Sequence, residues 1–240
     1  MLTTDLPVPE RVLAIGAHPD DIEFGCGATL AKWADAGATI HCCICTDGSK
    51  GTWDPDADPN ALVATRIAEQ EDAAAVLGAK AVEFLGYVDG ELDDTLDARA
   101  MVAAVIRRTR PDVVITHDPA PISRIHPDHR RAGYLVLDSI VAARDPLFFP
   151  EQGLEPHRPA LVLLFESEQP DHVERADAWL DRKIGALLRH RSQWRSTMHI
   201  DDRPEEQNAA FVREVRDTAA AQGLRAGVRA GEAFRRFTDL

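Results

Sequence analysis

The sequence predicts an α/β fold, a doubly wound and mostly parallel sheet with helices on both faces, within a single domain. Short apolar runs that suit buried strands alternate with longer segments of helical spacing from residue 11 onward. Neither a low-complexity run nor an internal repeat divides the chain. We therefore expect one domain over residues 1–240, and the Pro-rich bend at 145–159 is the place that best suits a boundary if there is one.

The first half of the chain supplies three predicted strand–helix units. Strands are expected over 11–17, 38–46 and 81–85, and helices over 25–36, 61–77 and 95–109. Gly37 and Gly78 close the first two helices, because glycine tolerates the left-handed conformation at a helix end. The polar loop at 47–60, rich in Gly, Pro and Asp, is longer than a simple connection requires.

The second half continues the alternation with two more strands. Strands are expected over 112–116 and 161–165, and helices over 127–143 and 173–191. Pro127 suits the first turn of its helix, where a missing N–H costs nothing. The tail after Arg203 has a mostly helical pattern, with Phe211 and Val215 on one side. We expect the part from about 150 to 240 to complete the substrate side of the domain.

The charge and the N-terminus restrict the class of partner. The formal net charge of -13 disfavours a nucleic-acid or anionic-membrane partner, since both call for clustered Lys and Arg. No signal peptide and no apolar run near the length of a membrane span occurs. The sequence therefore predicts a soluble, cytoplasmic protein with a small-molecule partner, and it leaves the number of subunits open, a homo-oligomer included.

The four cysteines are predicted to be buried and structural. They lie within one 20-residue stretch, which is a poor layout for disulfides between distant segments (Cys26, Cys42, Cys43 and Cys45). Cys42 and Cys45 have the spacing of half a zinc ribbon, but no second cysteine pair completes it. In a strand, free cysteine behaves as a small apolar residue.

Two histidine–carboxylate motifs follow the first and fourth strands. They are His18-Pro19-Asp20-Asp21 and His126-Pro127-Asp128-His129. In a Rossmann-like sheet of order 3-2-1-4-5 these two strands are neighbours, and their carboxyl ends open the crevice where ligands bind. We therefore expect the two motifs to meet in one site.

The residue types in this site suit a divalent metal of the zinc class. The candidate ligands are His18, Asp21 and His129, because imidazole and carboxylate are ordinary zinc ligands and a catalytic site keeps three of them. Asp20 and His126 then remain beside the metal, where hydrolysis needs a base for the attacking water and a donor for the oxyanion. The residues alone do not decide which aspartate is the base. Fe²⁺ or Co²⁺ fits the same ligands as Zn²⁺.

Structural roles compete with these functional ones. Asp20, Asp21 and Asp128 each stand near an expected helix start, where aspartate often caps the helix. His117 follows the fourth strand, where it either lines the site or is an exposed loop residue.

The two motifs resemble a known family, the metal-dependent N-deacetylases typified by N-acetylglucosaminyl-phosphatidylinositol de-N-acetylase and the mycothiol and bacillithiol pathway deacetylases (PIG-L or LmbE-like). The resemblance covers about residues 11–195, with weaker matches at Arg66 and Glu69, at 87–92 and at 186–193. It implies that His18, Asp21 and His129 bind zinc. It also implies that Asp20 is the general base and that His126 is the general acid or oxyanion stabiliser, held in place by Asp128.

The resemblance also bears on the substrate side. Arg66 either reaches the substrate or forms a helical pair with Glu69, and the pair is the simpler expectation. Ser49 stands where some members have Glu, and Arg124 stands where some have Tyr. Arg124 suits an anionic group of a substrate, or a surface carboxylate.

The sequence thus predicts a zinc-dependent hydrolase that removes an N-acetyl group from an N-acetylglucosamine-type amino sugar or glycoside. One alternative is an amidase that cleaves a larger acyl group from a sugar–thiol conjugate. Another is a metal-binding protein without catalysis. This alternative is disfavoured because a purely structural zinc site has four protein ligands, with neither an open position nor a base such as Asp20 beside it. A nucleotide-binding domain is disfavoured because the first loop lacks G-x-G-x-x-G.

Overall fold

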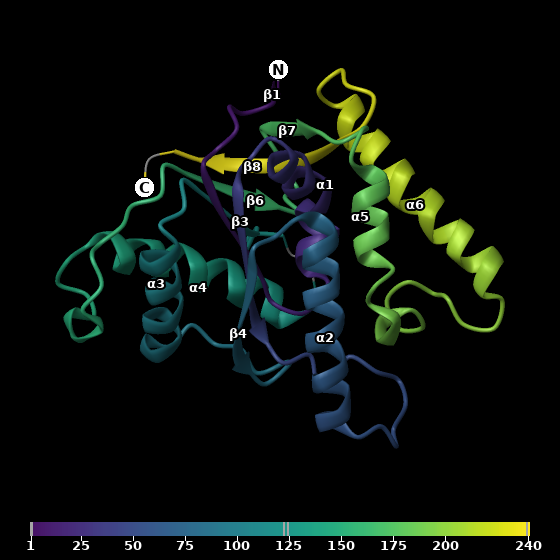
Figure 1. Cartoon of the computed structure of the whole chain (residues 1–240), viewed down its shortest axis with the longest axis horizontal. Helices are drawn as coiled ribbons and strands as arrows, with labels where there is room; N and C mark the ends of the chain where they lie inside the picture. The colour runs from purple at the N-terminus through teal and green to yellow at the C-terminus, as the bar shows by residue number, and fades with distance from the viewer. Residues whose placement is uncertain (1, 122, 124, 239) are drawn as a thin grey trace.

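A computed structural model describes residues 2–121, 123, 125–238 and 240. Its strands form one mixed sheet with the order β1-β7-β8-β6-β5-β2-β3-β4 (Figure 1). The strands are β1 Thr3–Thr4, β2 Arg11–Gly16, β3 Thr39–Thr46, β4 Ala81–Tyr87, β5 Val113–His117, β6 Leu161–Phe165, β7 His172–Arg175 and β8 Gly231–Phe237.

The five strands from β4 to β6 confirm the predicted order. They run β4-β3-β2-β5-β6 and are parallel throughout, which is 3-2-1-4-5 in the predicted numbering. The winding direction reverses between β2 and β5, which pair in register from Val12 with Val113. The carboxyl ends of these two strands therefore open side by side.

Helices cover both faces of the sheet, as predicted (Figure 1). They are α1 Asp21–Asp35, α2 Pro59–Leu77, α3 Leu96–Thr109, α4 Pro127–Arg144, α5 Leu180–Leu187 and α6 Pro204–Leu224, with short 3-10 turns η1 Pro150–Gln152 and η2 Arg191–Gln193. One buried cluster packs α1, α2 and α5 against one face, and a second packs α3 and α4 against the other. Alternate residues of β2 supply the two clusters, as Val12 and Leu13 illustrate.

Local signals explain the helix ends. Asp58 accepts the N–H of Asn60 at the start of α2, and Gly78 closes that helix at a φ of 84°. Thr95 accepts the N–H of Ala98 at the start of α3. Pro127 occupies the first turn of α4. These capping contacts fix where each helix begins relative to the strand before it.

Three sequence expectations need correction. The helix expected at 173–191 is instead β7 followed by the shorter α5, because a four-residue strand has no periodicity that separates it from a helix. The tail is not helical throughout, since β8 follows α6 and pairs antiparallel with β6 and β7. The first helix begins at Asp21 rather than at residue 25, so the first motif runs directly into it.

The four cysteines are free and buried, as expected. Among the helices of the described residues, none has both the length and the hydropathy that crossing a membrane demands.

Candidate metal and active site

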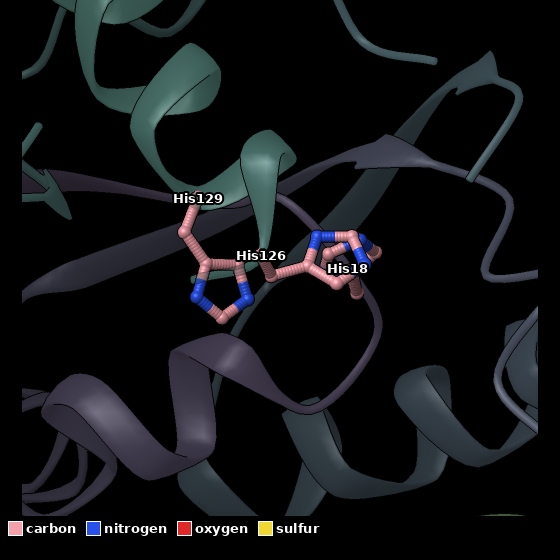
Figure 2. A group of neighbouring side chains, drawn as sticks. All are labelled: His18, His126 and His129. Carbon is pink, nitrogen blue, oxygen red and sulfur yellow. The ribbon is translucent and has the colours of Figure 1, made fainter. Parts of the chain in front are cut away.

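The two motifs meet at the carboxyl ends of β2 and β5. His18 lies in the loop between β2 and α1, and His126 and His129 lie at the start of α4. Figure 2 shows the three side chains as neighbours, with His126 and His129 coming from the start of α4. The ring centroids of His18 lie 4.5 Å from His126 and 5.2 Å from His129. The predicted convergence of the motifs is therefore present in the structure.

Asp21 lies between two of the predicted ligands. Its Oδ1 is 3.2 Å from His129 Nε2, and its Oδ2 is 3.4 Å from His18 Nδ1. The backbone N–H of His18 also donates to Asp21 Oδ2 at 2.6 Å. Burial opposes ionisation, but His129 and His117 hold the pKa of Asp21 well below its usual range. Asp21 is thus an anion facing the rings, and not a helix cap alone.

Two further carboxylates face the other nitrogen of His18. Asp128 Oδ2 lies 3.1 Å from His18 Nε2, and Asp89 Oδ1 lies 3.2 Å from the same nitrogen. Burial lowers the pKa of His18, but Asp128, Asp21 and Asp89 together raise it well above its usual value. A histidine whose second nitrogen donates to a carboxylate has the tautomer and orientation of a metal ligand.

Asp128 is placed differently from the expectation that it holds His126. Its carboxylate accepts the N–H groups of Gly90 (2.6 Å) and Leu92 (3.3 Å) besides contacting His18. The nearest contact of His126 with this residue is to its backbone, whose N–H donates to His126 Nδ1 at 3.4 Å. Asp89 Oδ1 lies 3.7 Å from His126 Nε2.

Asp20 is buried and borders the cleft described below. Asp20 directly precedes α1 with a φ of 104°, and its side chain accepts no hydrogen bond from the N–H groups at the start of that helix. Its Oδ2 lies 3.6 Å from Arg66 Nη2. Burial raises the pKa of Asp20 to about 6, although the Arg66 charge opposes the rise and the Asp21 charge adds to it. The capping role weighed for Asp20 is therefore wrong.

Arg66 links the loops around Asp20. Its guanidinium donates to the carbonyl oxygens of Pro19 (2.5 Å) and Gly48 (3.1 Å), and the side chain is buried. The expected helical pair with Glu69 is not formed, because Glu69 instead accepts from the N–H and hydroxyl of Ser192. Arg66 also borders the cleft described below. Arg124 lies outside the described residues.

His117 is not an exposed loop residue. It ends β5, is 1% exposed and stacks on His129 at 4.5 Å between ring centroids. The N–H of Ala17 donates to His117 Nε2 at 3.2 Å. The same nitrogen lies 3.2 Å from Asp21 Oδ2, so His117 contacts both the backbone ahead of the first motif and the Asp21 carboxylate.

Sequence reasoning did not single out Asp89 or Gln70. Asp89 follows β4, so the rule that polar residues at the carboxyl ends of parallel strands line the site could have found it. Gln70 carries no such signal, because a glutamine in the middle of a helix resembles a surface residue. Only the tertiary packing shows that Gln70 is fully buried.

Within the part of the chain that the structure describes, three overlapping groups of side chains are spaced to hold a metal ion. They are His18, His126 and His129; Asp21, His117 and His129; and His18, Asp89, His126 and Asp128. His129 and His18 each belong to two groups, so the ligand atoms form one continuous cluster rather than separate sites.

The cluster lies at one end of a cleft of about 660 Å³. The near end is polar and carries Lys50, Arg66 and Asp89 with the histidines. The far end is lined mainly by α6 and β8, including Phe211 and Thr218. A volume of this size suits a small-molecule ligand.

The fold and this site define a class of protein: an α/β domain with a histidine–carboxylate metal cluster and a buried aspartate at the switch point of its sheet. The sequence model of the GlcNAc-PI de-N-acetylase family (PIG-L) matches residues 13–140. The chain belongs to this family.

Individual relatives agree with the family. A diacetylchitobiose deacetylase of Thermococcus kodakarensis is 34% identical over 77% of this chain and 70% of its own length. A 1D-myo-inositol 2-acetamido-2-deoxy-alpha-D-glucopyranoside deacetylase of Kineococcus radiotolerans is 32% identical over 71% of this chain, which spans only 55% of that relative. The solved structure of N,N'-diacetylchitobiose deacetylase from Pyrococcus horikoshii superimposes with a TM-score of 0.86 at 32% identity, covering 96% of this chain and 84% of that one.

Proposed function

We propose that this protein is a zinc-dependent hydrolase that removes the N-acetyl group from an N-acetylglucosamine-type amino sugar or glycoside. The observation that carries the proposal is the position of Asp20, a buried carboxyl that stands beside a histidine–carboxylate cluster and lines a ligand-sized cleft. The relatives in the same family are deacetylases of such sugars by name.

The proposed ligands are His18, Asp21 and His129. Ligand atoms bound to a tetrahedral zinc ion lie about 3.3 Å apart, given zinc–ligand distances near 2.0–2.1 Å. Asp21 Oδ1 lies 3.2 Å from His129 Nε2 and Asp21 Oδ2 lies 3.4 Å from His18 Nδ1, and these spacings support an ion shared through Asp21. The three proposed ligands are divided between the groups described above, since His18 and His129 share one group and Asp21 and His129 share another. His18 Nε2, facing Asp128 and Asp89, then serves to orient the ring.

The reaction divides between a base and an acid. When bound, the metal supplies Lewis-acid polarisation of the amide carbonyl and lowers the pKa of water. Asp20 accepts the proton of the attacking water, a role that suits a carboxylate whose pKa lies near the working pH. His126, half-exposed at the rim of the site, donates to the developing oxyanion and then to the departing amine.

The substrate side combines both halves of the chain. We propose that Arg66, at the polar end of the cleft, contacts the sugar, with Arg124 from the loop before α4 as a second substrate residue. The far end of the cleft, built by the segment from about 150 to 240, takes the remainder of the glycoside. The four free, buried cysteines fit the reducing cytoplasm as the site of action.

A larger acyl group is a second candidate substrate, because a cleft of about 660 Å³ exceeds what one acetyl group fills. A series of glucosamines with N-acetyl to N-octanoyl groups separates the two cases. The proposal expects turnover to fall as the acyl chain lengthens.

The test of the proposed reaction is Asp20→Asn. The variant loses the base but keeps the ligands, so zinc content is expected to stay near that of the unmodified protein. Release of acetate from diacetylchitobiose is expected to fall by about 10²- to 10⁴-fold. Unchanged turnover in a zinc-loaded Asp20→Asn variant would exclude Asp20 as the base.

A further inference from the structure

The backbone of Asp20 is held in a conformation that an aspartate rarely adopts. Its φ of 104° and ψ of -24° lie outside the regions open to most side chains with a Cβ atom. A residue in such a conformation is strained and persists only where its surroundings impose the conformation. Something in the packing must therefore hold Asp20 in place.

Gln70 of α2 makes the contact that holds it. The N–H of Asp20 donates to Gln70 Oε1 at 2.9 Å, and Gln70 is 0% exposed. This bond joins α2 to the first residue ahead of α1, 50 positions away in the chain. Gln70 holds the N–H of the Pro19–Asp20 peptide while Arg66 holds its carbonyl at 2.5 Å, and the two bonds together set the direction in which the Asp20 side chain leaves the backbone.

Glu23 fixes the orientation of the Gln70 amide. Gln70 Nε2 donates to Glu23 Oε1 at 2.9 Å, and Glu23 is fully buried. A carboxylate only accepts, so the amide nitrogen of Gln70 must face Glu23 and its oxygen must face Asp20. The second oxygen of Glu23 lies 3.5 Å from Nε2 of His190, which is also buried. The three side chains form one continuous polar row that ends at the backbone of Asp20.

We infer that Gln70, oriented by Glu23, is a positioning residue that aims the Asp20 carboxylate at the reacting water. The inference rests on the proposed function, since it gives a reason for the strained backbone only if the direction of Asp20 matters. Neither residue reaches the cleft, so each acts through Asp20 and not on the substrate.

The test compares Gln70→Leu with a reciprocal exchange. Gln70→Leu removes the acceptor for the Asp20 N–H, so kcat is expected to fall by about 10²-fold with KM and zinc content little changed. In the double variant Glu23→Gln/Gln70→Glu, the new carboxylate at position 70 accepts the N–H of Asp20. The new amide at position 23 donates to that carboxylate. The row of hydrogen bonds is restored, and most of the lost kcat should return.

Gln152→Leu is the matched control. Gln152 also donates (to the Ala100 oxygen, 2.8 Å) and accepts (from Arg107 Nη1, 3.2 Å), but it lies on η1 away from the cleft. Its loss should leave kcat unchanged. Crystal structures of the Gln70 variants add a readout that does not depend on activity: φ of Asp20 should leave the positive range in Gln70→Leu and return to it in the exchange.

Three results would overturn the inference: a positive φ and full kcat in Gln70→Leu, loss of zinc from that variant, or a folded exchange variant without recovery. Failure of the proposed function looks different, because the unmodified, zinc-loaded protein would then release no acetate, whatever the φ of Asp20 in the variants.

Discussion

Two adjacent carboxyl groups in this site have opposite electrostatic surroundings. Asp21 faces His129 and His117, which keep its pKa low against the effect of burial. Asp20 is enclosed beside a single cation, Arg66, and burial raises its pKa to about 6. Neighbouring groups whose pKa values are driven apart can take different roles in a reaction. The sequence leaves open which aspartate is the base, and this difference is the reason that the proposed function assigns the role to Asp20.

His129 should be indispensable for metal binding. It belongs to two of the three ligand groups, and its Nε2 is the nitrogen nearest to Asp21 Oδ1. His129→Ala is therefore expected to lower the zinc content of the purified protein to near zero and to abolish acetate release with it. Metal analysis after dialysis against a weak chelator measures the loss.

His157→Ala provides the comparison. His157 is half-buried, and its Nε2 lies 2.7 Å from the Pro111 oxygen, remote from the cleft. That variant should retain zinc. Full zinc content in His129→Ala would remove this histidine from the ligand set.

At the scale of elements, α1 is two helical pieces joined by a break. Cys26 has a non-helical φ of -148°, which leaves backbone groups on both sides of the break without their usual partners. Lys183 of α5 donates to the Phe24 carbonyl at 2.7 Å, and Glu232 of β8 accepts the N–H groups of Ala28 and Thr29. Lys183 Nζ also lies 2.6 Å from Glu232 Oε1, so the two side chains form an ion pair. The break thus depends on residues from the far end of the chain.

Lys183→Met should be strongly destabilising. The change leaves the Glu232 carboxylate buried without its cation, and breaking a buried pair in this way costs about 3–5 kcal/mol. Chemical denaturation measures the change in the free energy of unfolding. Arg108→Met removes one partner of the half-exposed Arg108–Glu83 pair and should cost less than about 1 kcal/mol. Equal effects of the two changes would mean that the buried pair does not support α1.

The sheet order was predictable where the strands are long apolar runs. β2, β3, β5 and β6 are buried along most of their length, so their sequences are almost purely apolar. β7 and β8 were missed, because β7 has four residues and β8 ends in the exposed-type sequence Arg235-Arg236-Phe237. The pairing of β7 and β8 is decided by contacts between segments far apart in the chain, and a local sequence pattern does not reveal such contacts.

The candidate site divides in the same way. The motifs of His18 and His126 were recognisable because each follows a strand directly. His117 was recognised only as a residue that either lines the site or is exposed, and its burial at the end of β5 decides between the two. Gln70 was not recognised, since it lies within a helix. Their roles depend on which side chains they meet across the fold.

At the scale of the whole molecule, the N-terminal segment is tied to the sheet by charges. Asp5 contacts Lys32 of α1 and Arg175 of β7, and Lys32 also meets the fully buried Glu174. Burial would raise the pKa of Asp5, but Lys32 and Arg175 outweigh it and lower the pKa below 3.8. The segment before β2 is thereby held against α1 and β7.

Asp5→Asn should destabilise the protein in a pH-dependent way. Because the pKa of Asp5 is lower in the folded state, its contribution is fully present above about pH 3.8 and is lost as the pH falls through the folded pKa. At pH 7 the free energy of unfolding should drop by about 1 kcal/mol, and the difference should vanish near pH 2. A difference that is the same at both pH values would show that the Asp5 charge contributes nothing.

The two parts of the chain contribute differently to the cleft. Residues 13–140, which match the family, carry the candidate ligands and the residues proposed as base and acid. The segment beyond them supplies α5, α6, β7 and β8, and α6 lies outermost beside α5 (Figure 1). Phe211, Val215 and Ala219 follow one another at helical spacing on the side of α6 that lines the cleft. The reaction thus depends on the first part, while the length of the cleft depends on the second.

This division predicts a change that alters substrate choice without altering the chemistry. Thr218 is exposed and lines the far end of the cleft, so Thr218→Trp should narrow that end without disturbing the core. We expect kcat/KM for diacetylchitobiose to fall by about tenfold, because the added ring would displace one group of contacts between the longer sugar and the cleft. The kcat/KM for N-acetylglucosamine should stay unchanged. Arg213→Trp adds the same ring to an exposed position of α6 outside the cleft lining and should affect neither substrate. An equal fall for both sugars in Thr218→Trp would mean that α6 acts on the metal end, and no fall for either would mean that the substrate does not extend to α6.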